Sequence, residues 1–483
     1  MLAWLTLPLL IAGTVGCGRR ADVGPVVASV IGDTPALATD ERRAMPAADR
    51  LLTDSLAQGL VRFDAGGQIE AGVAERWIVS EGGRSYIFRL REARWADGKP
   101  VRAADVVALL RRQLRSRAAN RLAPYLTAIE SVVEMTPEVI EIELARPRPD
   151  LLKLFAQPEL AIVRTRPSGG SGPFRLREAR GRVLLLTPVA DPDRDPDGPG
   201  PAPEDDVRLI GERAAAAIIR FVERDSDLVT GGTLDDWPIL RAANPAPPNV
   251  RLDPAAGLFG LAVAHRDGFL ADASNRAALA LAIDRATLTA AFAADWPARE
   301  TTLPEQMDSA TPPVASGWTT IPAEQRVAAA RQQVARWSGT NGVPVVRIAL
   351  PNGPGGTLLF GQIARGLYAI GVRPVRAGID DADAELRLID SVAPYDSARW
   401  YLAEACVACS DEAQAAIEAA RLAATLDERA QANAAADRAL AADVAFIPIA
   451  RPFRWSLVAL RLRQWQANAR AWHPLNRLRL DTN

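Results

Sequence analysis

Residues Leu56 to Val107 constrain the fold of this 483-residue chain more than any other stretch. The glycine pairs Gly66-Gly67 and Gly82-Gly83 interrupt short runs that read as strands, which indicates strands joined by tight turns. Ser85 to Leu90 alternates polar and apolar residues, as does a strand with one buried face. Asp97-Gly98 marks a further turn, and helix-forming residues follow it. The stretch predicts a small α/β unit in which several strands precede a helix.

The residues of this stretch resemble the signature region of a known family. The matching pieces are GLVRFDAGGQI, AERWIVS, YIFRLR and WADGKPVRAADV. They resemble the extracellular solute-binding proteins of the peptide/nickel class, family 5, which deliver ligands to ABC importers. SGGSGPF at 168–174, NRAALALAIDR at 275–285 and IPI at 447–449 resemble later motifs of the same family. The resemblance runs with gaps from about Leu51 to the end of the chain.

The resemblance implies an α/β fold of two lobes, the class II periplasmic-binding-protein-like fold, with an extra subdomain in the larger lobe. After a leader at 1–20, it assigns 21–45, 161–254 and 453–483 to the core of lobe I, 46–160 to the subdomain of lobe I, and 255–452 to lobe II. The chain is expected to cross between lobes near residue 255 and to return near residue 452.

Local patterns predict further elements along the chain. Strands are expected at 26–31, 139–144, 183–186, 207–210, 258–263, 345–350, 372–375 and 455–460. Helices are expected at 103–117, 275–285, 358–370 and 410–444, the last divided in two near Asp427.

The overall charge gives no reason to expect a nucleic acid as partner. Lys and Arg number 57 and Asp and Glu number 58, which leaves a formal net charge of −1. Four arginines at 111, 112, 115 and 117 lie on one predicted helix, where we interpret them as a solvated face.

The first residues resemble a bacterial export signal. Leu2 to Val15 is apolar and too short for a membrane span, and Cys17 follows small residues where a cleavage site belongs. We favour lipidation of Cys17 over an ordinary cleaved signal, although no basic residue precedes the apolar run and Thr14 replaces the usual Leu. The expected location is the periplasm or cell surface, with a lipid anchor in a bacterial membrane.

The sequence offers no catalytic machinery that we can name. His265 and His473 are the two histidines, they lie far apart, and neither has a metal-ligand cluster around it. No G-x-S-x-G turn is present. We predict that the protein is not an enzyme and needs neither cofactor nor metal. For Cys406 and Cys409 we rank a structural disulfide first, two free thiols second, and a redox or metal role last.

Residues 193–204 match the spacing of an EF-hand calcium loop. Four prolines stiffen the segment, and no amphipathic helix flanks it. We therefore favour a solvated acidic turn between two strands over a calcium site.

The resemblance also indicates where a ligand would bind. Peptide-binding members hold the amino terminus of the peptide with an Asp in a loop that matches residues 390–402. Tyr395 and Leu402 are in register with that loop, whereas Pro394 stands at the position of the Asp and Ser391 at that of a Trp. The missing carboxylate puts recognition of a free amino terminus in doubt.

Candidate ligand-binding residues are chosen for charge or aromatic area in the expected cleft. They are Asp390, Tyr395, Asp396, Trp400 and Trp237. For each of them the ordinary alternative, core packing for the tryptophans and a solvated loop for the carboxylates, is favoured.

The functional hypothesis is capture of a short peptide or similar small solute by a monomeric binding protein that docks on ABC permease subunits. A sensory or scaffold lipoprotein with the same fold is the alternative, and a hydrolase is disfavoured by the missing triad.

Overall fold

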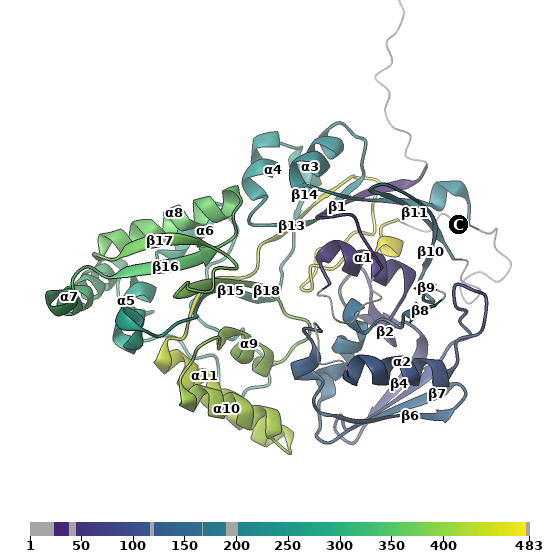
Figure 1. The fold of residues 1–483 in the computed structure, drawn as a ribbon, viewed down its shortest axis with the longest axis horizontal. Helices are drawn as coiled ribbons and strands as arrows, with labels where there is room; N and C mark the ends of the chain where they lie inside the picture. The colour runs from purple at the N-terminus through teal and green to yellow at the C-terminus, as the bar shows by residue number, and fades with distance from the viewer. Residues whose placement is uncertain (1–23, 38–44, 116–119, 167, 190–200, 480–483) are drawn as a thin grey trace, which may run out of the picture.

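The computed structural model describes residues 24–37, 45–115, 120–166, 168–189 and 201–479. Three large sheets with helices packed on them make up most of this part of the chain (Figure 1). A five-stranded sheet lies to the left in Figure 1, and the other two sheets lie to the centre and right. This arrangement agrees with the predicted α/β fold in two lobes.

The core of lobe I is a seven-stranded sheet in the order β10-β11-β12-β1-β13-β20-β14. Its central strand β1 runs parallel to β12 and β13, and five of its six residues are buried, as expected of a strand covered on both faces. The strands are β1 (Val26–Ile31), β10 (Phe174–Arg180), β11 (Val183–Pro188), β12 (Val207–Glu212), β13 (Leu228–Thr233), β14 (Val250–Leu252) and β20 (Arg454–Val458). Helices α1 (Ala47–Leu56), α3 (Ala214–Val222) and α4 (Trp237–Ala243) accompany it.

Helix α1 falls inside the predicted subdomain 46–160 but belongs by packing to the lobe I core. Its residues Leu51, Leu52 and Leu56 share a buried cluster with β1. The reason is that α1 buries its apolar face on the seven-stranded sheet.

The subdomain of lobe I is a four-stranded antiparallel sheet in the order β4-β5-β7-β6. Strand β5 turns Tyr86, Phe88 and Leu90 into the core, in keeping with its alternating sequence. The elements are β4 (Ala74–Ser80), β5 (Ser85–Leu90), β6 (Ile129–Thr136), β7 (Val139–Leu144), α2 (Ala103–Arg115), and the 3₁₀ segments η1 (Ala123–Tyr125), η2 (Pro149–Ala156) and η3 (Pro158–Leu160).

Lobe II is a five-stranded sheet in the order β17-β16-β18-β15-β19, flanked by helices. All seven residues of β15 are buried, since it lies between two strands in a sheet that helices flank. The strands are β15 (Gly257–Val263), β16 (Val345–Leu350), β17 (Arg373–Gly378), β18 (Leu386–Val392) and β19 (Phe446–Ala450). The helices are α5 (Ala273–Ala282), α6 (Arg285–Ala290), α7 (Ala323–Asn341), α8 (Pro354–Ala369), α9 (Ala398–Ala405), α10 (Asp411–Leu422) and α11 (Leu426–Asp443).

One predicted helix is divided in the structure. The helix expected over residues 275–285 is two helices, α5 and α6, with a break at Ile283 and Asp284. Asp284 is extended, and its carboxylate accepts a hydrogen bond from the backbone N–H of Thr287, so it caps α6 instead of continuing α5.

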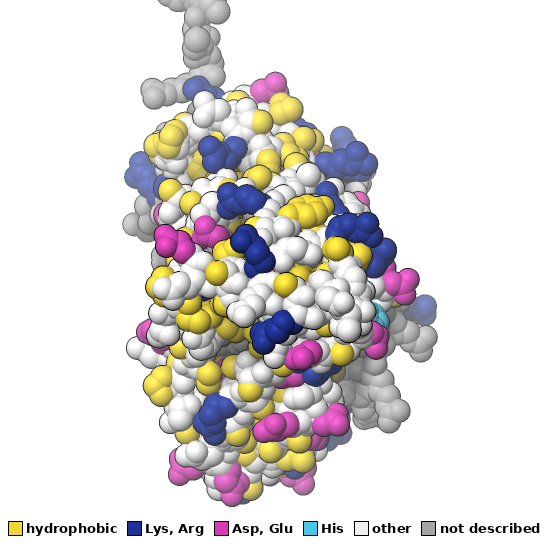
Figure 2. Space-filling view, turned by 90° about the vertical axis from the view of Figure 1, so that its left-hand side faces the viewer, with side chains coloured by type: hydrophobic (Ala, Val, Ile, Leu, Met, Phe, Trp, Pro, Cys, Tyr) yellow, Lys and Arg dark blue, Asp and Glu magenta, His cyan; other side chains and the backbone are white. Residues whose placement is uncertain are grey.

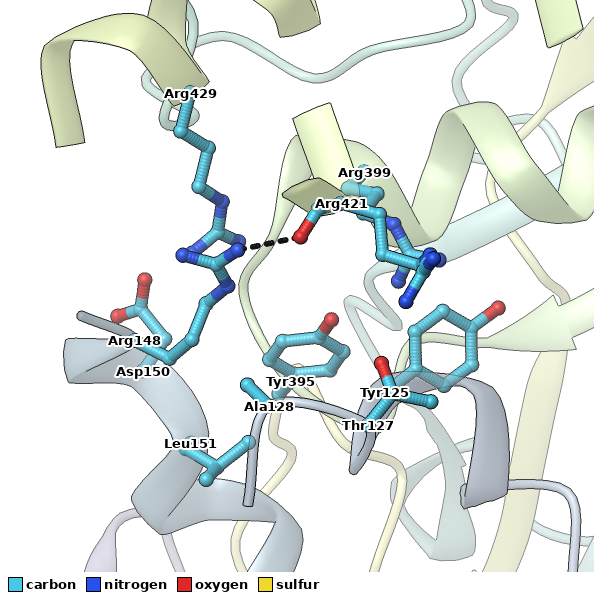
Figure 3. Close-up of a pocket in the computed structure, with 10 residues that line it drawn as sticks. All are labelled: Tyr125, Thr127, Ala128, Arg148, Asp150, Leu151, Tyr395, Arg399, Arg421 and Arg429. Carbon is cyan, nitrogen blue, oxygen red and sulfur yellow. Dashed lines mark hydrogen bonds between the residues drawn. The ribbon is translucent and has the colours of Figure 1, made fainter. Parts of the chain in front are cut away.

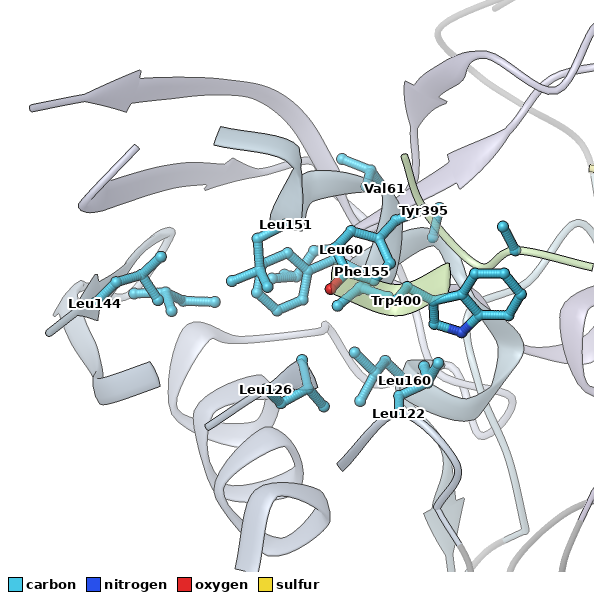
Figure 4. Packing of buried hydrophobic residues seen from close by; sticks show 14 of the residues in the cluster. Leu60, Val61, Leu122, Leu126, Leu144, Leu151, Phe155, Leu160, Tyr395 and Trp400 are labelled. Carbon is cyan, nitrogen blue, oxygen red and sulfur yellow. The ribbon is translucent and has the colours of Figure 1, made fainter. Parts of the chain in front are cut away.

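Two short segments join the lobes. Residues 253–256 connect β14 to β15, and residues 451–453 connect β19 to β20. A buried cluster also spans the subdomain of lobe I and lobe II: Tyr395 and Trp400 of lobe II pack near Leu60, Phe155 and Leu160 of lobe I (Figure 4). The two lobes therefore touch in this structure.

The glycines of the SGGSGPF turn allow a close approach of two backbones. A side chain on Gly170 or Gly172 would come within 2.5 Å of atoms of Ala57 at the end of α1. The turn thus fixes the start of β10 against α1.

The remaining strands are short. They are β2 (Val61–Phe63), β3 (Ile69–Ala71), β8 (Arg164–Thr165) and β9 (Ser168–Gly169). Over the described ranges, none of the helices combines the length and the apolar character that crossing a bilayer requires.

Candidate functional site

A pocket lies where the subdomain of lobe I meets lobe II. Its cavity volume is about 20 Å³, and about 370 Å³ lies between its walls when the open solvent is included. Lobe I supplies residues from η1, the chain after it and the start of η2, whereas lobe II supplies the loop after β18 and helices α9, α10 and α11 (Figure 3). The lining residues are Tyr125, Thr127, Ala128, Arg148, Asp150, Leu151, Tyr395, Arg399, Arg421 and Arg429.

Three of the lining arginines are almost fully buried. Arg148, Arg399 and Arg429 are 8%, 9% and 3% exposed. Burial, together with the nearby charge of Arg429, lowers the pKa of Arg148 to about 10. Burial likewise lowers the pKa of Arg399. The surroundings of Arg148 and Arg399 therefore oppose their positive charge.

The arginines differ in their partners. Arg429 forms an ion pair with Asp308 at 2.9 Å and donates a hydrogen bond of 2.7 Å to the Ser397 hydroxyl. Arg421 pairs with Glu418, one turn away on α10, at 2.5 Å. Both of these cations have a carboxylate beside them.

Among the described residues, Arg148 and Arg399 donate hydrogen bonds to carbonyl groups alone. Arg148 donates to the carbonyl oxygens of Pro147 at 2.6 Å and of Arg421 at 2.8 Å, the second bond crossing from lobe I to lobe II (Figure 3). Arg399 donates one long bond of 3.4 Å to the carbonyl of Pro124, also across the lobes, and its guanidinium lies 5.5 Å from the ring centre of Tyr125. Within the described ranges, neither has a carboxylate within ion-pair distance.

Asp150 is the one carboxylate among the lining residues. Burial, and next the charge of Asp308, raise its pKa above the usual value for Asp. The pocket wall is therefore strongly weighted toward positive charge.

Two tyrosines form an aromatic wall. The rings of Tyr125 from lobe I and Tyr395 from lobe II lie 5.7 Å apart at a tilt of 58°. Burial raises the pKa of both phenols, so they stay neutral and can donate a hydrogen bond. Of the residues chosen from sequence, Tyr395 is the one that lines this pocket.

Asp396 follows Tyr395 but points to other partners. Its carboxylate pairs with Lys153 of η2 and with Arg470 near the C-terminus, both of lobe I. Burial opposes its ionisation, but the charge of Arg470 and hydrogen bonds from Lys153 and Arg470 bring its pKa below the usual range. The group acts as a contact between lobes.

Asp390 is also occupied. It lies on β18, where its carboxylate pairs with Arg454 of β20 at 2.8 Å. Burial raises its pKa, and Arg454 counteracts the rise. Asp390 and Asp396 are thus each paired with an arginine of lobe I.

The two tryptophans fill cores and are not among the residues that line this pocket. Trp237 is 7% exposed, packs edge-on against Phe453, and donates its indole N–H to the carbonyl of Phe292 at 2.8 Å. Trp400 is 3% exposed and packs on Tyr401 at 4.9 Å between ring centres. Large aromatic rings gain most by complete burial, which accounts for both positions.

The cysteines and histidines of the described ranges do not line the pocket. A disulfide joins Cys406 and Cys409 after α9. His473 contacts Asp253 at 3.0 Å inside the fold, and His265 lies at the surface. Within the described ranges no group of three His, Cys, Asp or Glu side chains could hold a metal ion. Cys17 and most of the acidic segment at 193–204 lie outside the described residues.

The four arginines of the pocket, three of them buried, are the residues that sequence reasoning missed. They come from positions 148, 399, 421 and 429, with no motif linking the first to the others. The sequence holds 57 basic residues, nearly all of them Arg, so no single arginine stands out. Arg399 falls inside the loop that was compared with the family, and its position there was the available signal.

Sequence comparison finds relatives over short stretches. A probable deoxycholate-binding periplasmic protein, YgiS of Escherichia coli, is 42% identical over 72 residues, 15% of this chain and 14% of that protein. The periplasmic oligopeptide-binding protein OppA of Haemophilus influenzae is 34% identical over 87 residues, 18% of this chain and 16% of that protein. These alignments span less than a fifth of either relative.

Structural comparison covers almost the whole chain. The murein tripeptide binding protein MppA of Escherichia coli superposes with a TM-score of 0.79 at 18% identity, over 95% of this chain and 98% of that one. This likeness confirms the predicted bilobal fold. The family model for bacterial extracellular solute-binding proteins, family 5, matches residues 68–342, more than half of the chain. The chain therefore belongs to the bacterial extracellular solute-binding proteins of family 5.

Proposed function

We propose that this protein is the extracytoplasmic solute-binding component of an ABC importer and captures a short peptide or similar small solute between its lobes. The observation that carries the proposal is the pocket, whose walls come from both lobes. A solute held there touches both bodies at once, so it stabilises the closed arrangement over an open one.

The connection between the lobes suits such a movement. The segments 253–256 and 451–453 are short, and each connects a strand of one sheet to a strand of the other. They lie next to one another. Hinges of this kind absorb a rotation in a few residues while the sheets stay rigid. We propose that 21–45, 161–254 and 453–483 move with the subdomain 46–160 as lobe I, and that 255–452 moves as lobe II.

The relatives favour capture over the sensory or scaffold alternative. YgiS and OppA are both named for what they bind, deoxycholate and oligopeptides. A family of binding proteins also gives no reason to expect catalysis, and we propose that this chain releases its solute unchanged. Its partners would be permease subunits, and it would act as a monomer.

The location follows from the same proposal. The relatives are periplasmic proteins, and we propose the periplasm or cell surface for this chain. Lipidation at Cys17 would hold it at a bacterial membrane. Mass analysis of the processed N-terminus tests the anchor: a diacylated Cys17 supports it, and an unmodified residue beyond 17 rules it out.

Native mass spectrometry of the protein purified from a bacterial periplasm tests the capture of a solute. The proposal expects a small molecule bound one to one and released on unfolding. Protein that is empty, and whose melting temperature does not respond to peptides or other small solutes, would contradict it.

A further inference from the structure

The pocket contains more positive charge than its own carboxylates balance. Four arginines and one aspartate line it, and two of the arginines, Arg421 and Arg429, have an acidic partner outside the lining. Arg148 and Arg399 have none within the described ranges, although both are at least nine-tenths buried. A buried cation without a counter-charge is unfavourable, so these positions call for an anion.

Unused donors point the same way. The Nε–H groups of Arg399 and Arg429 are buried and have no hydrogen-bond partner. Among the described residues, Arg399 donates one long hydrogen bond, of 3.4 Å, to the Pro124 carbonyl. A guanidinium with free N–H groups binds the two oxygens of a carboxylate or phosphate in a matching fork.

The arrangement of charges in the pocket differs from that on one outer face of the molecule. Figure 2 shows one face of the molecule, on which Lys and Arg side chains are interspersed with Asp and Glu. In the pocket the guanidinium groups of Arg148 and Arg429 instead approach one another from opposite lobes (Figure 3). Their mutual repulsion is part of what lowers the pKa of Arg148.

We propose, resting on the capture of a solute proposed above, that the solute is a small organic anion whose oxyanion group lies between Arg148 of lobe I and Arg399 and Arg429 of lobe II. The group is a carboxylate or a phosphate. In a peptide it would be an acidic side chain or the C-terminal carboxylate. The amino terminus is not an anion, and Pro394 stands where the family has the Asp that binds it. Tyr125 and Tyr395 provide the wall for the rest of the solute.

The anion also links binding to closure. Without it, the like charges of Arg148 and Arg429 face one another across the lobes and oppose the hydrogen bonds by which Arg148 and Arg399 join them. With it, each lobe gains a charge-assisted hydrogen bond to the same group. The solute then removes a repulsion and adds an attraction, which makes its affinity for the closed form higher than for the open form.

The first test identifies what is bound. The whole processed protein is purified from a bacterial periplasm, and the solute released on unfolding is identified by mass spectrometry. We expect a carboxylate or a phosphate, and the mass distinguishes the two. A stoichiometric neutral or cationic solute would overturn the anion while leaving the capture of a solute in place.

The second test uses three variants. Arg399→Gln removes the least engaged charge, Arg399→Lys keeps the charge without the fork, and Arg331→Gln is the control, an exposed arginine of α7 bonded only to the Ala369 carbonyl. We expect Arg399→Gln to weaken affinity for the released solute by about tenfold to a hundredfold. Arg399→Lys should recover part of the loss, and Arg331→Gln should bind as the unaltered protein does.

If the purified protein is empty, thermal shifts decide. The probes are the tripeptide Ala-Glu-Ala, its neutral counterpart Ala-Gln-Ala amide, glutarate, glucose 6-phosphate and glucose. A shift with an anionic probe, lost in Arg399→Gln, supports the proposal. A shift with neutral probes only overturns the anion alone, and no shift with any probe overturns the capture of a solute as well.

Discussion

Arg276 in the core of lobe II and Arg399 in the pocket are both buried, but they differ in how many of their N–H groups have hydrogen-bond partners. Arg276 is 1% exposed, and its guanidinium pairs with Asp443 at 2.7 Å while donating to the carbonyls of Leu270 and Asp443. Arg399 is 9% exposed and has one long bond to a carbonyl. The fold engages the N–H groups of Arg276, whereas Arg399 lines the pocket and keeps a buried Nε–H without a partner, which a solute can use.

The largest expected effect concerns Arg276, the arginine that is fully paired within the fold. Asp443→Ala should lower the free energy of unfolding by about 3–5 kcal/mol, because it leaves Arg276 buried without its partner. Asp443 also accepts from Arg266 and from the Ser410 backbone N–H, so the change reaches three groups. Urea denaturation measures the loss.

Glu418→Ala is the control for that measurement, since it breaks the Glu418–Arg421 pair on the surface of α10. Exposed pairs contribute about 0–1 kcal/mol. A loss no greater for Asp443→Ala than for Glu418→Ala would mean that the buried network does not stabilise lobe II.

Asp437, six residues before Asp443 on α11, is a buried carboxylate without a cationic partner among the described residues. It is 2% exposed, and burial raises its pKa to about 6 despite a hydrogen bond from the Val314 N–H. Asp437→Asn should raise the free energy of unfolding at pH 7 by up to about 2 kcal/mol, because the neutral amide avoids burying a charge.

The pH dependence of this effect is set by the proton that Asp437 binds. The folded protein holds the proton at Asp437 more tightly than the unfolded chain, whose pKa is near 3.8, so this group adds stability as the pH falls through about 6 toward 4. The advantage of Asp437→Asn should therefore shrink over that range in thermal melts. A constant advantage at all pH values would show that ionisation of Asp437 is not its cause.

Asp396 tests a charge that joins the lobes. Asp396→Asn weakens the contacts of lobe II with Lys153 and Arg470. It should make closure of the lobes less favourable by about 1 kcal/mol, a small amount because the carboxylate is partly exposed. Small-angle scattering should show a larger radius of gyration without solute and the usual value with it. An unchanged radius in both states would mean that other contacts decide the closure.

The smallest expected effect lies on the pocket side. Arg399→Gln should leave the free energy of unfolding of the solute-free protein unchanged or raise it by about 1 kcal/mol, because it removes a buried cation that has no counter-charge in the part of the chain that the structure describes. Chemical denaturation after removal of the solute measures it. A loss above about 2 kcal/mol would place Arg399 with Arg276, among the arginines that hold the fold.

The sequence predicted local structure better than the site. Strands β5, β7 and β16 have the predicted bounds. In β5 and β7 the alternation of polar and apolar residues reports which face is buried, and β16 is a short apolar run typical of a buried strand. The break between α5 and α6 was missed because Asp284, inside an apolar helical pattern, caps a new helix. Capping depends on backbone geometry that the pattern does not carry.

The site depends on residues that only folding brings together. Arg148 and Arg429 are separated by most of lobe II in sequence, and nothing in the neighbourhood of either indicates that they meet. Tyr395 was found because it keeps its place in a family loop. Trp237 and Trp400 were chosen for aromatic area, but this same property draws them into the core.

Small-angle scattering with and without the natural solute tests the central claim most directly. The protein is stripped of its solute by unfolding and refolding, and the radius of gyration is measured before and after the solute is returned. Closure around an anion predicts a larger radius in the stripped protein and recovery on return of the solute. The same radius in both states, with binding shown independently, would contradict it.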